Sequence, residues 1–227
     1  MQMKLVSVNV GLPREVTWHG MNIKTGIFKQ PVTGRVALRK VNLDGDRQAD
    51  LTVHGGEDKA VYCYPVAHYA YWKKELQGRE LPTGMFGENF TLDFPAYAGL
   101  PEDSVHVGDR FSVGSAEVIV TQPRLPCYKL GIRFQMDDMV KRFLASGRTG
   151  FYLAVTREGE VGPGDDFNAI SRDSNGVTIS QIIRLYIAKR YSDEDARVLE
   201  RALRVPSLPE TLKEYFRARL TRANIEI

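Results

Sequence analysis

The chain has 227 residues and a mass of 25.6 kDa, and 43% of its residues are hydrophobic and 26% are charged. This composition is typical of a soluble globular protein with enough apolar side chains for a core, and it excludes a disordered chain, a collagen and a coiled coil. The 31 basic and 28 acidic residues nearly balance, and the resulting net charge of +3 does not indicate a nucleic-acid-binding surface. At roughly 150 residues per domain, the length allows one domain or two.

Only two cysteines are present, Cys63 and Cys127. They are too few for a disulfide scaffold or for a zinc site made of cysteines alone. No run approaches the ~20 apolar residues that cross a bilayer, and the first residues lack the apolar segment of a signal peptide. We therefore expect no membrane association, a cytoplasmic location and two reduced thiols.

Residues 1–176 contain short apolar, β-rich runs separated by turn residues. The predicted strands are Val6–Val10, Arg35–Val41, Ala60–Tyr64, Asn89–Leu92, Arg110–Val113, Glu117–Thr121 and Phe151–Thr156. Two helices are predicted, Pro65–Leu76, which opens on a proline, and Asp137–Ala145, which Gly147 closes. Many short strands with few helices favour a barrel-like β domain, and the strict helix–strand alternation of a doubly wound nucleotide fold is missing.

After Gly176 the pattern becomes helical. One helix is predicted over Gln181–Lys189, and a second begins at Ser192 with Asp195 as its capping partner. The segment Ser207–Glu210 has the pattern of a capping box for a third helix, whose buried stripe is Leu212, Tyr215, Phe216 and Leu220. Because about 50 residues are few for independent stability, we expect this three-helix unit, residues 177–227, to pack on the β domain, residues 1–176.

Cys127 lies in a segment that is stiffened by two prolines and flanked by Arg124 and Lys129. Neighbouring cations favour the thiolate, which attacks electrophiles and binds metals. A small buried side chain beside accidental charges is the alternative, and the local sequence leaves both open. Cys63 has Val61, Tyr62 and Tyr64 as neighbours, which predicts a cysteine in a core strand.

Three further segments carry polar groups that suit a ligand site or a plain turn. His54 precedes a pair of glycines and is a candidate hydrogen-bond donor, acid–base group or metal ligand, or the cap of a turn. The amide of Asn89 suits a heterocycle edge or an Asx-turn. Lys29 suits a phosphate, although no Walker motif or dinucleotide fingerprint surrounds it. Asp44-Gly45-Asp46 is most simply a hairpin turn.

The order and spacing of these segments resemble the MOSC domain, and specifically its YiiM-like branch. The matching motifs are Asp50 with His54-Gly55-Gly56, Phe86-Gly87-Glu88-Asn89-Phe90, Val107-Gly108-Asp109, Gln122-Pro123-Arg124 with Pro126-Cys127-Tyr128-Lys129, Gly150-Phe151-Tyr152 and Pro163-Gly164-Asp165. The resemblance covers nearly the whole chain, because a three-helix unit follows the MOSC domain in this branch. It implies a mainly β fold, a MOSC β-barrel with a few helices, plus a small C-terminal three-helix domain.

The resemblance also implies a molybdenum cofactor, molybdopterin, whose metal Cys127 would ligate. It associates this branch with the reductive detoxification of N-hydroxylated bases such as 6-hydroxylaminopurine, and pyridoxal phosphate binding is a label of the family only. The residues near the matched motifs take secondary roles in this interpretation. His54 would donate protons, Asp50 would orient His54 or a pterin amine, and the remaining cofactor-binding candidates are Lys29, Arg35, Asn89, Gln122 and Arg124.

The reaction expected from this resemblance converts R–NHOH, two electrons and two protons into R–NH₂ and water. Two cysteines cannot hold a four-cysteine iron–sulfur cluster, so the electrons would come from a separate reductase. The competing hypotheses are a non-redox sulfur or cofactor carrier that uses a Cys127 persulfide, and a binding module in which the three-helix unit recognises a partner. Nucleic acid is not expected as that partner, and a homodimer stays open.

Overall fold

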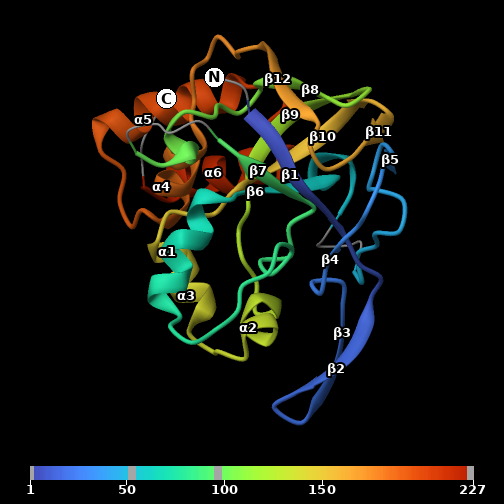
Figure 1. Ribbon diagram of the computed structural model, residues 1–227. Helices are drawn as coiled ribbons and strands as arrows, with labels where there is room; N and C mark the ends of the chain where they lie inside the picture. The colour runs from blue at the N-terminus through green and yellow to red at the C-terminus, as the bar shows by residue number, and fades with distance from the viewer. Residues whose placement is uncertain (1–2, 51–54, 95–98, 224–227) are drawn as a thin grey trace.

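The computed structural model describes residues 3–50, 55–94 and 99–223, and it confirms a mainly β fold with helices (Figure 1). Seven strands form a closed barrel, in which the pairing of β1 with β12 joins the two edges of the sheet. In their order around the barrel they are β1 (Met3–Val10), β12 (Asp166–Ser171), β8 (Arg110–Val113), β9 (Ala116–Pro123), β10 (Phe151–Arg157), β6 (Val61–Pro65) and β7 (Phe90–Asp93). The pair β6–β7 is parallel and the other pairs of the barrel are antiparallel.

Alternating side chains explain why these segments form strands. In β9, Val118 and Val120 point into the core, while intervening positions are half-buried. Gly114 has φ of 55° and shapes the hairpin in which Val113 pairs with Ala116. Burial of a large apolar side chain contributes about 1.5–3 kcal/mol, so the inward-facing positions stabilise the barrel.

Five smaller strands and two short 3₁₀ helices of the described chain extend the barrel. These are the hairpin of β2 (Arg14–Trp18) and β3 (Met21–Thr25), β4 (Gln30–Pro31) on the edge of β1, the pair β5 (Val36–Leu38) and β11 (Gly159–Val161), η1 (Glu57–Lys59) and η2 (Pro101–Asp103). The β2–β3 hairpin projects well beyond the barrel (Figure 1). Of these strands, the sequence predicts only β5, and it makes β5 too long.

Three helices pack beside the barrel around an aromatic cluster that includes Tyr64, Trp72, Phe86 and Phe143: α1 (Ala67–Glu75), α2 (Lys129–Phe134) and α3 (Met139–Ala145). The prediction that Pro65 opens a helix is wrong, because Pro65 ends β6 and pairs with Leu92. The six-residue helix α2 is not predicted at all. It begins directly after the Cys127 segment, so it matters for the site.

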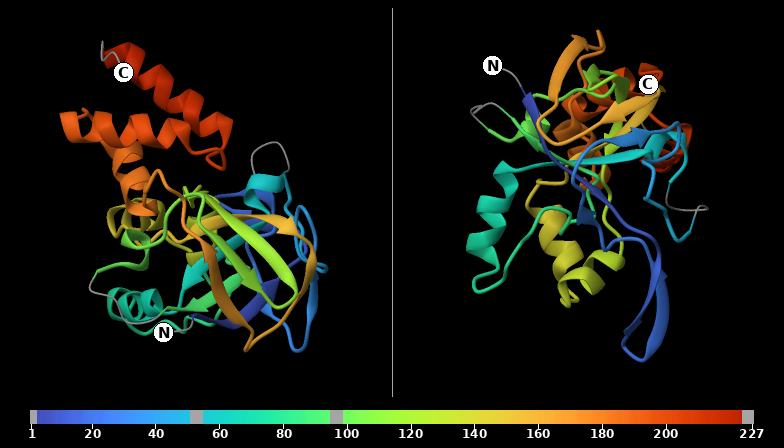
Figure 2. Two further views of the ribbon diagram at one scale, coloured as in Figure 1. Left: turned by 90° about the horizontal axis from the view of Figure 1, so that it is seen from above. Right: turned by 45° about the vertical axis from the view of Figure 1, so that its right-hand side comes forward.

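The last helices are α4 (Ile179–Ile187), α5 (Asp193–Arg204) and α6 (Glu210–Ala223), and Figure 2 shows them gathered on one side of the barrel. The Ser192–Asp195 capping box is confirmed, and Thr178 with Gln181 forms another. Ser207 does not cap α6. Its hydroxyl instead donates to the carbonyl of Val120 in β9 at 3.0 Å.

Apolar side chains of the three helices belong to the same core cluster as the barrel, as the expectation that they pack on it requires. Leu199 and Phe216 are examples, and both are fully buried. The boundary at residue 176 stays a prediction. Within the described part of the chain, no helix is both long and apolar enough to cross a membrane.

Candidate functional site

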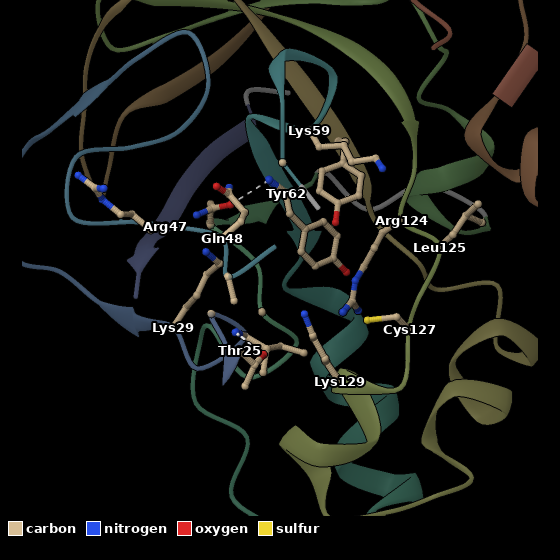
Figure 3. Close-up of a pocket in the computed structure, with 17 residues that line it drawn as sticks. Thr25, Lys29, Arg47, Gln48, Lys59, Tyr62, Arg124, Leu125, Cys127 and Lys129 are labelled. Carbon is tan, nitrogen blue, oxygen red and sulfur yellow. Dashed lines mark hydrogen bonds between the residues drawn. The ribbon is translucent and has the colours of Figure 1, made fainter. Parts of the chain in front are cut away.

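A cleft of about 690 Å³, open solvent at its mouth included, brings together segments that are far apart in the sequence (Figure 3). The segments come from the end of β3, from the loop before η1, from β6 and β10, and from the Cys127 loop. The lining residues are Thr25, Gly26, Ile27, Lys29, Arg47, Gln48, Ala49, Gly55, Lys59, Tyr62, Gly87, Asn89, Arg124, Leu125, Cys127, Lys129 and Tyr152.

The loop between β9 and α2 places Cys127 at one end of this cleft. The backbone N–H of Arg124 donates to the carbonyl of Gly150 at 3.3 Å, which fixes the start of the loop. The N–H of Leu130 donates to the carbonyl of Cys127 at 3.0 Å, which fixes its end. Cys127 forms no disulfide within the described chain, and as a half-buried residue of the lining it is accessible from the cleft.

Cys63 behaves differently and confirms its predicted place in the core. Its side chain is completely buried in β6, and burial raises the pKa of its thiol well above the ordinary value. A thiol that stays protonated is a poor nucleophile and a poor metal ligand. Cys127 is therefore the cysteine available for chemistry.

Arg124 is the buried cation of the cleft, with only 6% of its surface exposed. Its guanidinium lies over the rings of Tyr62 at 4.9 Å and Phe143 at 5.2 Å from the ring centres. Burial opposes its charge, but attraction to Tyr62, Tyr152 and Cys127 outweighs burial, and the pKa of Arg124 is raised. Its buried Nη1 has no hydrogen-bond partner among the described residues. A buried donor without a partner is costly, so this atom marks a place where a ligand would bind.

The buried carboxylate of Asp46 lies next to the end of the cleft that is opposite Cys127 and binds residues there. It accepts hydrogen bonds from the ammonium of Lys29, from the backbone N–H of Gly11 at 2.9 Å and from Nδ2 of Asn89 at 2.9 Å. Burial is the largest influence on Lys29 and lowers its pKa, although Asp46 acts in the opposite direction. Lys29 thus lines the cleft as a positive charge that already has a counter-ion.

The amide of Asn89 is fully used in this structure. Nδ2 donates to the carbonyl of Asn9 at 3.2 Å as well as to Asp46, and Oδ1 accepts from the N–H of Tyr62 at 3.1 Å. Asn89 therefore ties β1, β6 and the Asp46 loop together. Its predicted role in pairing with a heterocycle would require these bonds to break.

The electrostatics of the cleft are one-sided. Its described lining contains five basic residues and no acidic one; the basic residues are Lys29, Arg47, Lys59, Arg124 and Lys129. Desolvation also lowers the pKa of Lys59, as it does that of Lys29. Cations that converge on one space without acidic neighbours in the lining favour an anionic ligand such as a phosphate.

Four of the residues predicted from the sequence line this cleft: Lys29, Asn89, Arg124 and Cys127. Arg35 lies outside the described lining, directly before β5, and its guanidinium donates to Asp165 at 2.9 Å and to the carbonyl of Glu160 at 2.7 Å, so its cofactor-binding role stays a prediction. In this structure Arg35 and Asp165 form an ion pair near β11.

Asp50 and Gln122 are absent from the described lining of the cleft. Gln122 is buried in β9 opposite Tyr152, and its Nε2 has no hydrogen-bond partner within the described chain. His54 lies outside the described residues, so its proposed role stays a prediction. Sequence reasoning missed Arg47, Lys59 and Asp46. The one available signal was the density of charged residues between 44 and 59, which the turn interpretation did not use.

Comparison with known proteins decides the family. Residues 50–168 match the model of the MOSC domain, which is more than half of the chain. The chain belongs to the MOSC domain family. This MOSC protein is 40% identical over 215 residues to the uncharacterized protein YflK of Bacillus subtilis, covering 93% of the chain and 92% of YflK. It is 37% identical over 159 residues to protein YiiM of Escherichia coli, covering 69% of the chain and 68% of YiiM.

The crystal structure of YiiM from Geobacillus stearothermophilus superposes with a TM-score of 0.77 at 35% identity, covering 96% of this chain and 99% of that one. A protein of Gibberella moniliformis named "Reductase" is 28% identical over 176 residues, which span 76% of this chain and 30% of that protein. These relatives confirm the resemblance to the YiiM-like branch. MOSC domains are associated with the molybdenum cofactor, and the cleft can be tested against that group.

Proposed function

We propose that this MOSC protein is a molybdenum-cofactor-dependent reductase of N-hydroxylated compounds. The observation that carries the proposal is the half-buried Cys127 thiol beside the unpartnered Nη1 of Arg124, in a cleft whose described lining has five basic residues and no acidic one. A molybdopterin cofactor bears a phosphate and a polar heterocycle, and its metal accepts soft thiolate ligands. The donor set of the cleft fits these three features.

The residues divide the binding task between the two ends of the cleft. Cys127 supplies the thiolate ligand, and Arg124 supplies a rigid, stacked guanidinium with a free N–H at the same end. Lys29 and Arg47 supply positive charge at the other end, where Figure 3 shows them apart from Cys127. Phosphate oxygens are the natural partners of such cations.

The cofactor supplies the electrons, and the protein residues bind, orient and exclude water. The net reaction is R–NHOH plus two electrons and two protons giving R–NH₂ and water, with electrons delivered by a separate reductase. The relative named "Reductase" supports this direction of chemistry. Burial raises the pKa of Tyr152, so its hydroxyl keeps its proton at neutral pH and can act as a hydrogen-bond donor at the cleft. The hydroxyl of Tyr62 donates instead to the carbonyl of Thr149 at 2.8 Å.

The decisive experiment replaces the proposed metal ligand and compares it with the other cysteine. Cys127→Ser, produced in a host that makes molybdopterin, is expected to lose molybdenum and pterin and to lose reduction of an N-hydroxylated purine. Cys63→Ala is the matched control, since it also removes one thiol but leaves the cleft intact. Metal analysis, pterin fluorescence and reduction with a chemical electron donor are the measurements.

Normal molybdenum content and activity in Cys127→Ser would refute the proposed ligand role. A sulfur adduct on Cys127 of the purified wild-type protein, together with no pterin, would instead favour the persulfide carrier. Mass analysis of the intact chain distinguishes these outcomes. A folded Cys127→Ser variant is expected, because the residue is half-buried and lies in a loop outside the barrel strands.

A further inference from the structure

A second groove continues from the cleft beyond Arg47. It shares Arg47, Gln48 and Ala49 with the cleft, and it measures about 1070 Å³ with open solvent included. The four residues that it adds are Leu12, Pro13, Lys24 and Gly45. The two spaces therefore adjoin along one wall, the segment 47–49, and the groove lies at the base of the projecting β2–β3 hairpin.

Both walls of this groove are fixed by backbone hydrogen bonds. The N–H of Gly11 donates to Asp46 Oδ1 at 2.9 Å, and the N–H of Arg47 donates to the carbonyl of Gly11 at 3.1 Å. Gly26 lets the walls approach closely, because a Cβ there would lie 2.4 Å from the carbonyl oxygen of Arg47. The wall residues that follow Gly11 and Arg47 are consequently held in place without any ligand.

The groove is apolar on one side and cationic on the other. The side chain of Leu12 is 61% exposed beside Pro13, and it offers an apolar shelf. Lys24 and Arg47 are exposed, and within the described chain neither side chain has an ion pair or hydrogen bond. No acidic residue belongs to the described lining. An apolar shelf beside two free cations matches a nucleoside that carries a phosphate.

We propose that this groove binds a nucleoside phosphate unit, with the phosphate at Lys24 and Arg47 and the nucleoside against Leu12 and Pro13. Two kinds of molecule contain such a nucleoside phosphate unit. It is either the nucleotide part of an N-hydroxylated substrate or a nucleotide extension of the pterin cofactor. The assignment of a source rests on the proposed function, whereas binding of the unit itself does not.

The first test measures binding of adenosine 5′-monophosphate and of adenosine to the cofactor-free protein by calorimetry. We expect the monophosphate to bind at least about tenfold more tightly than the nucleoside, because charge-assisted contacts to phosphate are strong. Leu12→Glu puts a carboxylate on the shelf and is expected to abolish that preference. Met21→Glu is the matched control, since Met21 is 60% exposed on the hairpin and does not line the groove.

A second pair of variants removes charge. Lys24→Gln reaches the groove without touching the lining of the Cys127 cleft and is expected to reduce the preference for the monophosphate several-fold. Lys73→Gln removes another exposed lysine, on α1, and is expected to change nothing. Equal affinity for nucleoside and monophosphate in the wild type would overturn the proposal. So would a preference that survives both Leu12→Glu and Lys24→Gln.

The source is decided on the molybdenum-loaded protein. A nucleotide found by mass spectrometry in the extracted cofactor assigns the groove to the cofactor. A kcat/KM that is higher for an N-hydroxylated nucleoside monophosphate than for its nucleoside, and that Leu12→Glu equalises, assigns it to the substrate. A wild type that fails to load molybdenum refutes the proposed function and leaves the calorimetric result standing, so the two failures are distinguishable.

Discussion

The cleft and the three C-terminal helices both collect basic side chains, but the helices pair several of theirs with acidic side chains, whereas the described lining of the cleft contains no acidic residue. In the helices, Arg184 contacts Glu194 and Asp195, and Arg217 contacts Glu210. Arg219 donates to the carbonyls at the end of α4, including that of Leu185 at 3.0 Å. These cations neutralise acids and complete a helix terminus, which are structural tasks.

The cleft shows the opposite arrangement. Its described lining offers the basic side chains no acidic neighbour, and Arg124 leaves a buried nitrogen unpartnered. Lys29 is the exception, since Asp46 neutralises it. The difference teaches that the number of basic residues says little about function, whereas unmet hydrogen-bonding capacity in a concave space points to a ligand.

The largest effect on stability is expected for the buried ion pair of Lys29 and Asp46 beside the cleft. Asp46→Asn should lower the free energy of unfolding by about 3–5 kcal/mol, because it leaves the buried ammonium of Lys29 without a counter-ion. Urea unfolding at neutral pH measures this change. Adding Lys29→Met should restore part of the loss, and a double variant as unstable as the single one would contradict this account.

A smaller effect is expected for the unpartnered cation. Arg124→Gln should reduce retention of molybdenum and pterin by about 10- to 100-fold, since a hydrogen bond from a charged donor contributes about 1.5–3 kcal/mol. Cofactor content after extensive dialysis is the measurement. Arg124→Lys is not expected to restore retention, because an ammonium lacks the planar stacking on Tyr62. Full retention in both variants would place the cofactor elsewhere.

The third prediction concerns Glu88, which is completely buried beneath the cleft and accepts a hydrogen bond from the N–H of Gly84 at 2.7 Å. Burial is the largest influence and raises the pKa of this carboxyl above 4.5. The folded protein therefore binds more protons than the unfolded chain just above pH 4.5, so this contribution to stability is full below pH 4.5 and is lost as the pH rises. The stability advantage of wild type over Glu88→Gln should accordingly shrink as the pH rises above about 4.5 in urea titrations. An advantage that grows over this range would reverse the sign and refute the assignment.

The smallest effect is expected in the helices. Arg217→Gln breaks an exposed ion pair with Glu210, and such pairs contribute little because water screens both charges. We expect an unchanged urea midpoint and unchanged cofactor retention. A clear loss of retention would show that the contrast between the two regions is wrong, since a partnered cation far along the chain would then serve the cleft.

The sequence predicts the barrel strands that bury alternating side chains, and it misses those that do not. The strand β12 buries only Phe167 deeply, so its residues show no alternation to detect. In the hairpin β2–β3, the pair His19-Gly20 has positive φ at both residues and is a turn signal that pattern reading overlooked. Closure of the barrel by β1 and β12 joins the two ends of the domain, which local patterns do not encode.

The residues of the site also fall into those that local sequence predicts and those that only the fold brings together. Cys127 and Arg124 lie in one stiff, unusual segment, so sequence reasoning finds them together. Arg47 reaches the cleft, with Asp46 next to it, only because their loop packs against Gly11 and Gly26, contacts between residues 21–36 positions apart. Arg35 shows the converse case: it is a basic residue near a motif, but the fold pairs it with Asp165 and places it outside the described lining.

Strand β9 connects the C-terminal helices to the loop that contains Cys127. The hydroxyl of Ser207 holds the middle of β9 at Val120, α4 packs on the same strand, and β9 ends one residue before Arg124. Local opening of a protein proceeds through units that are bonded together. The C-terminal helices contribute no described residue to the cleft, yet they contact the strand that leads into the cysteine loop. Local unfolding of the three helices would therefore remove contacts from β9, the strand that leads into the cysteine loop.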